Sequence, residues 1–310
     1  MSRRRPEVSI ILPTMAHRER ASSLARAIDT VVSQDGVRGI PLVVVNGNAG
    51  APEALARLRR RADIRLVVRD EADLPRALQA GRALVDTPYF AVLDDDDELL
   101  PGALRTRLDA LEQAPGADVV VTNGFLAGAG RRALNLEDFR RIRADPLRTL
   151  LERNWLPPCA GLFRTGAVTL EFFDEIPRYR EWTYLALRLA LTLRICFAEH
   201  PTFVYRTDTP DSLSKSRAYC LAGPAAIQRM LQLELPADVR AALRVRLASD
   251  LHSVSTQELD DGNYRAAWWW HFRSLAQPSG WRYLPYARNL LLRPLMRRAP
   301  AARARRAVMP

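Results

Sequence analysis

The stretch from Tyr89 to Leu104 reads YFAVLDDDDELLPGAL. It opens with an apolar run of aromatic and branched residues, which is typical of a buried strand. Four aspartates, Asp94 to Asp97, follow at once, and a segment of helical period begins near Pro101. A strand, a charged loop and a helix in this order predict one unit of an α/β sheet, with carboxylates at the carboxyl end of its strand.

The same alternation runs through the first 125 residues of the chain. Apolar runs of strand length lie at residues 8–12, 41–45, 64–68, 89–93 and 118–122, and segments of helical period separate them. This pattern predicts a Rossmann-like, mostly parallel sheet with helices on both faces. Because such sheets bind ligands at the carboxyl ends of their strands, we expect the site in the loops after Leu12, Val45 and Leu93.

The rest of the chain predicts a different organisation. Residues 126–180 contain turn-forming segments and no strong period, which indicates an irregular region that builds part of a site. The pattern from Trp182 to Ala198 is helical, and beyond Gly223 the chain reads as successive helices. We therefore expect an α/β domain over residues 1–220 and a helical C-terminal extension over residues 221–310.

Composition and charge exclude several kinds of site. The three cysteines form no C-x-x-C pair and the four histidines lack zinc-ligand spacing, which argues against a disulfide framework and a structural zinc centre. All 35 acidic residues lie at or before Asp261, as do 36 of the 46 basic residues, so residues 1–261 carry +1 and residues 262–310 carry +10. A nearly neutral body argues against nucleic acid as the main partner. We expect a cytoplasmic protein, because the first apolar run is too short for a signal peptide.

The four aspartates need a compensating charge, because neighbouring carboxylates repel one another. In an extended segment alternate side chains share a face, so Asp94 and Asp96 would point together at one hard cation, Mg²⁺ or Mn²⁺. A solvated acidic loop at the start of the next helix is the alternative interpretation. An EF-hand is excluded, because Leu99 and Arg105 occupy the positions of its glycine and its closing glutamate.

Four blocks of sequence carry a resemblance to a known family. They are VSIILPTMAHRERASSLARAIDTVVSQ from Val8, GRALVDTPYFAVLDDDDELLPGAL from Gly81, LFRTGAVTLEFFDEIPRYREWTYLALRLAL from Leu162 and FVYRTDTPDSLSKS from Phe203. In this order they resemble the opening strand and P-T loop, the D-x-D motif, the E-D-W region and the Y-R…S-x-S stretch of family-2 glycosyltransferases of the GT-A fold. The resemblance implies a metal-dependent, inverting transfer of sugar from a nucleoside-diphosphate donor to a hydroxyl of a glycan, lipid-linked or protein acceptor.

The resemblance also implies which residues form the site. Asp94 and Asp96 would hold the divalent cation that bridges the donor's diphosphate, with Asp97 as a further ligand. Glu181, just before Trp182, would be the general base that takes the proton of the acceptor hydroxyl, and Asp174 and Glu175 are alternatives. The residues expected to contact the donor are Pro13, Thr14, Arg18, Asn46, Asp94, Asp95 and Arg206.

The chain departs from the family pattern at several positions. Asn46 stands where the family commonly has the acid that reads the nucleotide base, and Arg180 replaces the first acid of E-D-W. A non-catalytic nucleotide-sugar-binding or scaffold homologue is therefore the alternative function. A nucleotidyltransferase would need a glycine-rich loop with a lysine after the first strand, and PTMAHRER has neither.

The last residues combine aromatic and basic side chains. The segment from Ala267 to Arg306 contains AWWWHFRSL and GWRYLPYARNLLLRP and holds nine arginines and no acid. Aromatic rings beside arginines suit a membrane interface with anionic lipid, so we expect peripheral contact with the cytoplasmic face of a membrane. The alternative is that the tryptophans pack on the first domain and the arginines form a solvated tail.

Overall fold

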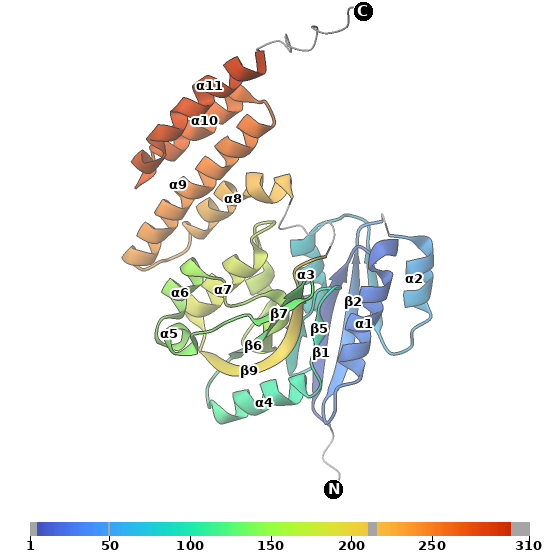
Figure 1. Ribbon diagram of the computed structural model, residues 1–310. Coiled ribbons are helices and arrows are strands. Elements are labelled where there is room, and N and C mark those ends of the chain that lie inside the picture. Colours follow the sequence, from blue (N-terminus) through green and yellow to red (C-terminus); the bar gives the residue numbers. More distant parts are fainter. Residues whose placement is uncertain (1–4, 49, 210–215, 299–310) are drawn as a thin grey trace, which may run out of the picture. The chain divides into compact units, whose positions relative to one another are not determined.

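The computed structural model describes residues 5–48, 50–209 and 216–298, with side chains as far as Arg293 (Figure 1). The chain divides into two compact units, Met1–Pro210 and Asp211–Pro310. The first unit holds a nine-stranded sheet in the order β3-β2-β1-β4-β8-β6-β9-β5, with β7 paired to β6. The second unit is helical.

The amino-terminal half of the sheet is parallel, as the alternating pattern predicts. Strand β1 pairs with both β2 and β4, and β2 pairs with β3. The strands are β1 (Glu7–Thr14), β2 (Arg38–Asn46), β3 (Arg65–Arg69) and β4 (Tyr89–Val92). The helices that connect them are α1 (Ala21–Val32), α2 (Pro52–Arg59) and α3 (Leu74–Ala83).

The second half of the sheet is mixed. Strand β6 runs parallel to β9, whereas β8 is antiparallel to both β4 and β6, and the two short strands β5 and β7 are antiparallel to β9 and β6. The elements are β5 (Glu98–Leu99), α4 (Ala103–Gln113), β6 (Val119–Gly128), β7 (Arg131–Leu134), β8 (Gly161–Arg164) and β9 (Ile195–Arg206). The expected α/β fold with helices on both faces and a helical C-terminal part is confirmed (Figure 1).

The region between β7 and β9 contains more regular structure than the sequence pattern predicts. Asp138 and Asp145 accept hydrogen bonds from Arg141 N and Arg148 N, each at 3.0 Å, and so cap α5 and α6. The region holds α5 (Phe139–Ala144), α6 (Pro146–Glu152), α7 (Glu181–Thr192) and short 3₁₀ turns at Pro158–Ala160 and Leu170–Phe173. The expectation of a helix as far as Ala198 is wrong, because the chain enters β9 at Ile195 and pairs there with Val119 of β6.

A buried arginine ties the second half of the sheet together. Arg107 of α4 is fully buried, and its guanidinium donates to Cys159 O at 2.5 Å, to Gly161 O at 3.2 Å and to Thr202 Oγ1 at 2.8 Å. Burial lowers its pKa to about 10, so it still carries its charge at neutral pH. Because one side chain satisfies two carbonyls and a hydroxyl, it fixes the Pro158–Ala160 turn beside β9.

The helical unit consists of α8 (Arg217–Met230), α9 (Ala237–Asp260), α10 (Tyr264–Leu275), a 3₁₀ segment at Gly280–Tyr286 and α11 (Ala287–Arg298). A small core of Leu259, Ala267 and Leu290 joins α9, α10 and α11. The first helix begins at Arg217, and the division between the units falls at Pro210, whereas the sequence pattern placed the boundary at residue 220. None of the described helices is long and apolar enough to cross a membrane.

Candidate active site

Four aspartates form a turn at the carboxyl end of β4. Asp97 N donates to Asp94 O at 3.1 Å, so the backbone turns back here and is not extended as the sequence pattern predicts. The turn brings one carboxylate oxygen from each of Asp94, Asp96 and Asp97 within 4.8 Å of one another. The expected pair, Asp94 and Asp96, is therefore joined by Asp97, and we call these three residues the acidic turn.

The acidic turn has the properties of a cation site. Asp97 is buried, and its Oδ1 accepts a hydrogen bond from Arg206 N at 2.9 Å. Its Oδ2 is also buried and has no hydrogen-bond partner among the described residues. Burial, followed by the charges of neighbouring carboxylates, raises the pKa of both Asp94 and Asp97. A hard divalent cation fits this set of oxygens, because it would relieve the repulsion and give the orphaned oxygen a partner.

Asp95 lies outside this group of three and has its own partners. Its Oδ2 accepts a hydrogen bond of 2.6 Å from the hydroxyl of Thr14, at the end of β1, and its Oδ1 pairs with Arg20. A second guanidinium nitrogen of Arg20 lies 3.5 Å from Asp96 Oδ2. Asp95 therefore joins the ends of β1 and β4, and Arg20 partly compensates the charge of the cluster.

The other residues expected to contact the donor lie around this edge of the sheet. Pro13 and Thr14 are buried at the end of β1. Arg18 is exposed, and its guanidinium lies 3.4 Å from Glu53 Oε1. The guanidinium of Arg206 lies 2.8 Å from Glu98 Oε1, so its side chain is held at the rim beside the acidic turn.

Asn46 ends β2 and has a structural partner. Its side-chain oxygen accepts a hydrogen bond from Asp73 N at 2.8 Å, and the carboxylate of Asp73 accepts one from Arg76 N at 3.0 Å. The second interaction caps α3. The asparagine thus fixes the start of α3 against the end of β2 through an acceptor oxygen, which a carboxylate at this position would also supply.

Glu181 is the first residue of α7 and is buried. Its Oε1 accepts a hydrogen bond from Tyr179 N at 2.8 Å. Burial raises the pKa of its carboxyl group, and the negative charge of Asp73 acts in the same direction. The alternatives Asp174 and Glu175 are both exposed. A buried carboxylate with a raised pKa is a better proton acceptor than an exposed one, which favours Glu181.

Three residues beside the acidic turn were not expected from the sequence. Arg20 contacts two of the aspartates, as described above. The thiol of Cys159 is buried, and burial together with the nearby carboxylates raises the pKa of Cys159 and that of Tyr205. The only sequence signal for Tyr205 was its place in the Y-R block, and Cys159 had none. The part of that block at residues 210–215 lies outside the described residues.

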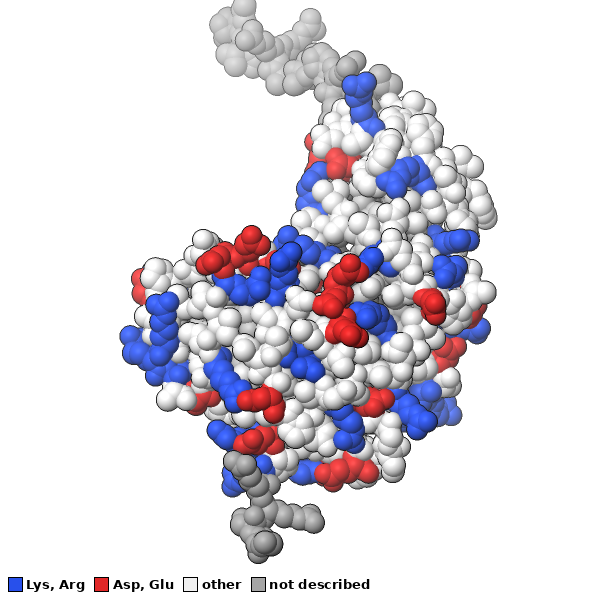
Figure 2. All heavy atoms as spheres, turned by 180° about the vertical axis from the view of Figure 1, so that it is seen from behind, with Lys and Arg blue, Asp and Glu red and all other residues white. Residues whose placement is uncertain are grey.

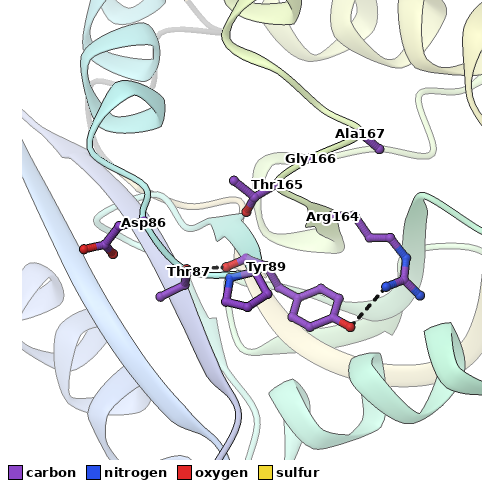
Figure 3. A pocket seen from close by; sticks show the side chains of 8 residues that line it. Asp86, Thr87, Tyr89, Arg164, Thr165, Gly166 and Ala167 are labelled. Atoms are coloured by element: carbon purple, nitrogen blue, oxygen red, sulfur yellow. Dashed lines mark hydrogen bonds between the residues drawn. The ribbon is translucent and has the colours of Figure 1, made fainter.

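A shallow recess of about 620 Å³ lies elsewhere on the first unit (Figure 3). It is lined by Asp86–Tyr89, at the start of β4, and by Arg164–Ala167, at the end of β8. In Figure 3 the side chains of Arg164 and Tyr89 meet, with the guanidinium donating to the phenolic oxygen at 3.1 Å. Because β4 starts at the recess and ends at Val92, two residues before Asp94, the recess lies at the opposite edge of the sheet from the acidic turn.

Comparisons with known sequences find two matches in this chain. Residues 9–174 match the family model described as glycosyl transferase family 2. The succinoglycan biosynthesis protein ExoO of Rhizobium meliloti (strain 1021) is 29% identical over 146 residues, which are 47% of this chain and 41% of that protein. The chain therefore matches about two fifths of the length of this relative.

Among solved structures, two of S. aureus TarS residues 1–349 are similar to this chain. The complex with UDP-GlcNAc has a TM-score of 0.56 and 14% identity, covering 80% of this chain and 72% of that chain. The complex with UDP has a TM-score of 0.52 and 13% identity, covering 79% of this chain and 71% of that chain. At these identities the likeness shows a shared fold.

Proposed function

Because the chain belongs to glycosyl transferase family 2, we propose that it transfers a sugar from a nucleoside-diphosphate donor to a hydroxyl group of a glycan, lipid-linked or protein acceptor. The observation that carries this proposal is the acidic turn. Three carboxylates converge at the carboxyl end of β4, and one of them keeps a buried oxygen without a hydrogen-bond partner among the described residues. Open α/β sheets bind their ligands at this edge.

Asp94, Asp96 and Asp97 would hold a divalent cation, Mg²⁺ or Mn²⁺. When bound, such a cation stabilises the negative charge that develops on the diphosphate as the sugar leaves. Asp95 and Arg20 support this arrangement, because the Asp95 carboxylate is fixed by Thr14 and the Arg20 guanidinium also reaches Asp96. Thr14, Pro13 and Asn46 would line the nucleotide site, and Arg18 and Arg206 would lie at its rim.

Glu181 would act as the general base. A sugar hydroxyl is a weak nucleophile until its proton is removed, and the Glu181 carboxylate would accept that proton as the oxygen attacks the anomeric carbon. Attack opposite to the leaving diphosphate is a single displacement, so the configuration at the anomeric carbon would be inverted. The buried position of Glu181 and its raised pKa make its carboxylate a stronger proton acceptor.

The similar proteins guide the choice of substrates. The TarS structures contain UDP-GlcNAc and UDP, so a uridine diphosphate sugar is the first donor that we propose. ExoO is named for succinoglycan biosynthesis, which supports an acceptor in the assembly of a surface polysaccharide. Such an acceptor would be met at the cytoplasmic face of a membrane.

Ligand-dependent unfolding tests the donor site. We expect one nucleoside diphosphate to raise the thermal midpoint in the presence of Mn²⁺, because a ligand that binds only the folded state stabilises it. Asp96→Ala should abolish this rise, whereas Asp109→Asn, a change of a half-exposed acid on α4, should keep it. No rise with any nucleoside diphosphate at millimolar concentration would contradict the proposal. A rise that is unaffected by Asp96→Ala would place the ligand elsewhere.

A further inference from the structure

The helical unit exposes large apolar side chains on three consecutive segments. Trp269 and Phe272 on α10 are 53% and 60% exposed, Trp281 on the 3₁₀ segment is 71% exposed, and Leu291 on α11 is 60% exposed. Single exposed apolar residues are common on proteins, but tryptophan and phenylalanine at these exposures are not. The exposed large apolar side chains of these three segments are Trp269, Phe272, Trp281, Leu284, Leu291 and Leu292.

The packing of α10 and α11 explains why these side chains face outward. The buried residues of α10 are Ala267, His271 and Ser274, which recur at helical spacing and form one face of the helix. This face contacts α9, where the hydroxyl of Ser255 donates a hydrogen bond of 2.7 Å to Ala267 O. Trp269 and Phe272 lie off that buried face. In the same way α11 inserts Leu290 into the small core, which leaves its neighbours Leu291 and Leu292 exposed.

Arginines accompany the apolar side chains. The guanidinium of Arg273 lies over the ring of Trp269 at 4.5 Å from the ring centroid and over that of Trp270 at 5.0 Å. Arg282 and Arg288 are exposed and lie close to Trp281 and Leu291 in the chain. In Figure 2 the part of the helical unit next to the grey C-terminal residues shows basic side chains among uncharged surface, with acidic side chains beside some of them.

The charge of this part of the chain has one sign. Residues 262–310 contain no acid and carry a formal charge of +10. Asp260, near the end of α9, is paired with Arg293. Aromatic and aliphatic side chains together with unopposed arginines are the combination that binds a lipid interface, where rings lie among headgroups and arginines meet anionic lipid.

We propose that these six apolar residues, with Arg273, Arg282 and Arg288, form a docking surface for a bilayer of anionic phospholipids. The charge distribution favours a bilayer over a second copy of the chain, because two such surfaces carry the same sign and repel. It also favours a bilayer over RNA, since Leu284, Leu291 and Leu292 offer no ring on which a base could stack. Building on the proposed function, this surface would keep the enzyme near lipid-linked acceptors. Lipid binding by the surface does not depend on sugar transfer.

Vesicle flotation of the 310-residue chain tests the proposal. We expect the protein to float with phosphatidylcholine vesicles that contain phosphatidylglycerol, and to bind vesicles of phosphatidylcholine alone about tenfold more weakly, because the arginines contribute only against anionic lipid. Added salt should weaken the binding. Equal binding to both kinds of vesicle, or none to either, would overturn the proposal.

Two variants assign the binding to this surface. Trp269→Ser with Trp281→Ser removes two of the three exposed rings, and Arg282→Gln with Arg288→Gln removes two exposed charges. Each pair should weaken binding to anionic vesicles by about tenfold or more. Leu134→Ser, a change of an exposed apolar residue on β7, is the matched control and should bind like the parent. Unchanged binding by both double variants would overturn the assignment.

Two further readouts separate lipid binding from donor binding and from self-association. The Mn²⁺-dependent rise in thermal midpoint with nucleoside diphosphate should be the same in both double variants and in the parent, because the changes lie in the helical unit. If no nucleoside diphosphate raises the thermal midpoint, vesicle binding can still be measured. The donor-site proposal and the lipid-docking proposal are therefore tested independently. A parent that sediments as a dimer and becomes a monomer in the tryptophan variant would overturn the lipid proposal in favour of self-association.

Discussion

At the scale of single residues, Asp95 shows which part of the site the local sequence predicts and which part it does not. The run of four aspartates after an apolar strand predicts carboxylates at the sheet edge. It does not predict that Asp95 faces Thr14 and Arg20 while the other three converge, because that depends on the backbone turn between Asp94 and Asp97. Arg20 is 75 residues distant in sequence from Asp95, and nothing distinguishes it among the many arginines of the chain.

Removing the Arg20 charge should destabilise the sheet edge. In Arg20→Gln the nearly buried carboxylate of Asp95 loses its ion pair, and we expect the free energy of unfolding to fall by about 1–3 kcal/mol. Mn²⁺ should restore part of this loss, since a bound cation compensates the same cluster. Urea unfolding with and without Mn²⁺ measures both effects.

Arg105→Gln is the matched control for this change. Arg105 forms ion pairs with Asp109 and Glu112 on the solvent-facing side of α4. Pairs near the surface contribute about 0–1 kcal/mol, so this variant should stay close to the parent. An Arg20→Gln protein as stable as Arg105→Gln would show that Arg20 does not compensate the buried carboxylate.

At the scale of elements, the strands of the first half of the sheet could be predicted and the end of α7 could not. Residues 182–198 are mostly apolar, and periodicity alone does not separate a short buried helix from a buried strand. The outcome is decided by β6, which offers Val119, Val120 and Val121 as partners for Ile195, Cys196 and Phe197. The strand that pairs with this segment depends on the tertiary structure, so local sequence does not predict it.

The packing of α3 on β1 depends on a glycine. A Cβ at Gly81 would lie 2.4 Å from Cγ2 of Ile11, which is fully buried and has no room to move. We expect Gly81→Ala to lower the free energy of unfolding by about 1–3 kcal/mol, although alanine favours a helix by about 1 kcal/mol. Equilibrium unfolding in urea measures the change.

Gly166→Ala serves as the control for that substitution. A Cβ at Gly166 would meet nothing within 4 Å, so its effect should stay within about 0.5 kcal/mol. Equal stability of the two variants would mean that α3 lies farther from β1 than the structure places it.

A histidine cluster makes the helical unit sensitive to pH. His271 is fully buried, neither of its ring nitrogens has a hydrogen-bond partner among the described residues, and burial lowers its pKa. Burial and the nearby His271 also lower the pKa of His252, which stacks on Tyr283 at a centroid distance of 4.1 Å. Both histidines are therefore neutral in the folded unit at neutral pH.

The sign of the pH dependence follows from these lowered pKa values. The unfolded chain binds protons below its ordinary histidine pKa of about 6.5, whereas the folded unit resists them. The free energy of unfolding should therefore be highest above that pH and should fall as the pH decreases toward the pKa of the histidines in the folded unit. Tryptophan fluorescence in urea at about pH 7.5 and pH 5.5 would report this, because four of the six tryptophans lie in the helical unit. His271→Leu should reduce the difference between the two pH values, and an unchanged difference would contradict the assignment of the effect to His271.

At the scale of the whole molecule, the division into two units is visible in the sequence as a change of period and of charge. The alternating pattern belongs to the unit with the sheet, and the +10 charge of residues 262–310 lies within the helical unit. The boundary itself could be placed only to within about ten residues, since Ser216 caps α8 with a side chain that resembles any other serine of that region. The function that we propose for the molecule rests on its family and on the acidic turn at the carboxyl end of β4.

The most direct test of the central claim is donor turnover by the parent, Glu181→Gln and Asp96→Ala proteins. The release of nucleoside diphosphate from a uridine diphosphate sugar would be measured with Mn²⁺ and a panel of acceptor sugars. We predict turnover by the parent, a loss of about 10²-fold or more in Glu181→Gln with donor binding retained, and loss of both binding and turnover in Asp96→Ala. Equal turnover by the parent and Glu181→Gln would contradict the assignment of the base. Donor binding without turnover in all three proteins would indicate a nucleotide-sugar-binding protein that has kept the fold without the chemistry.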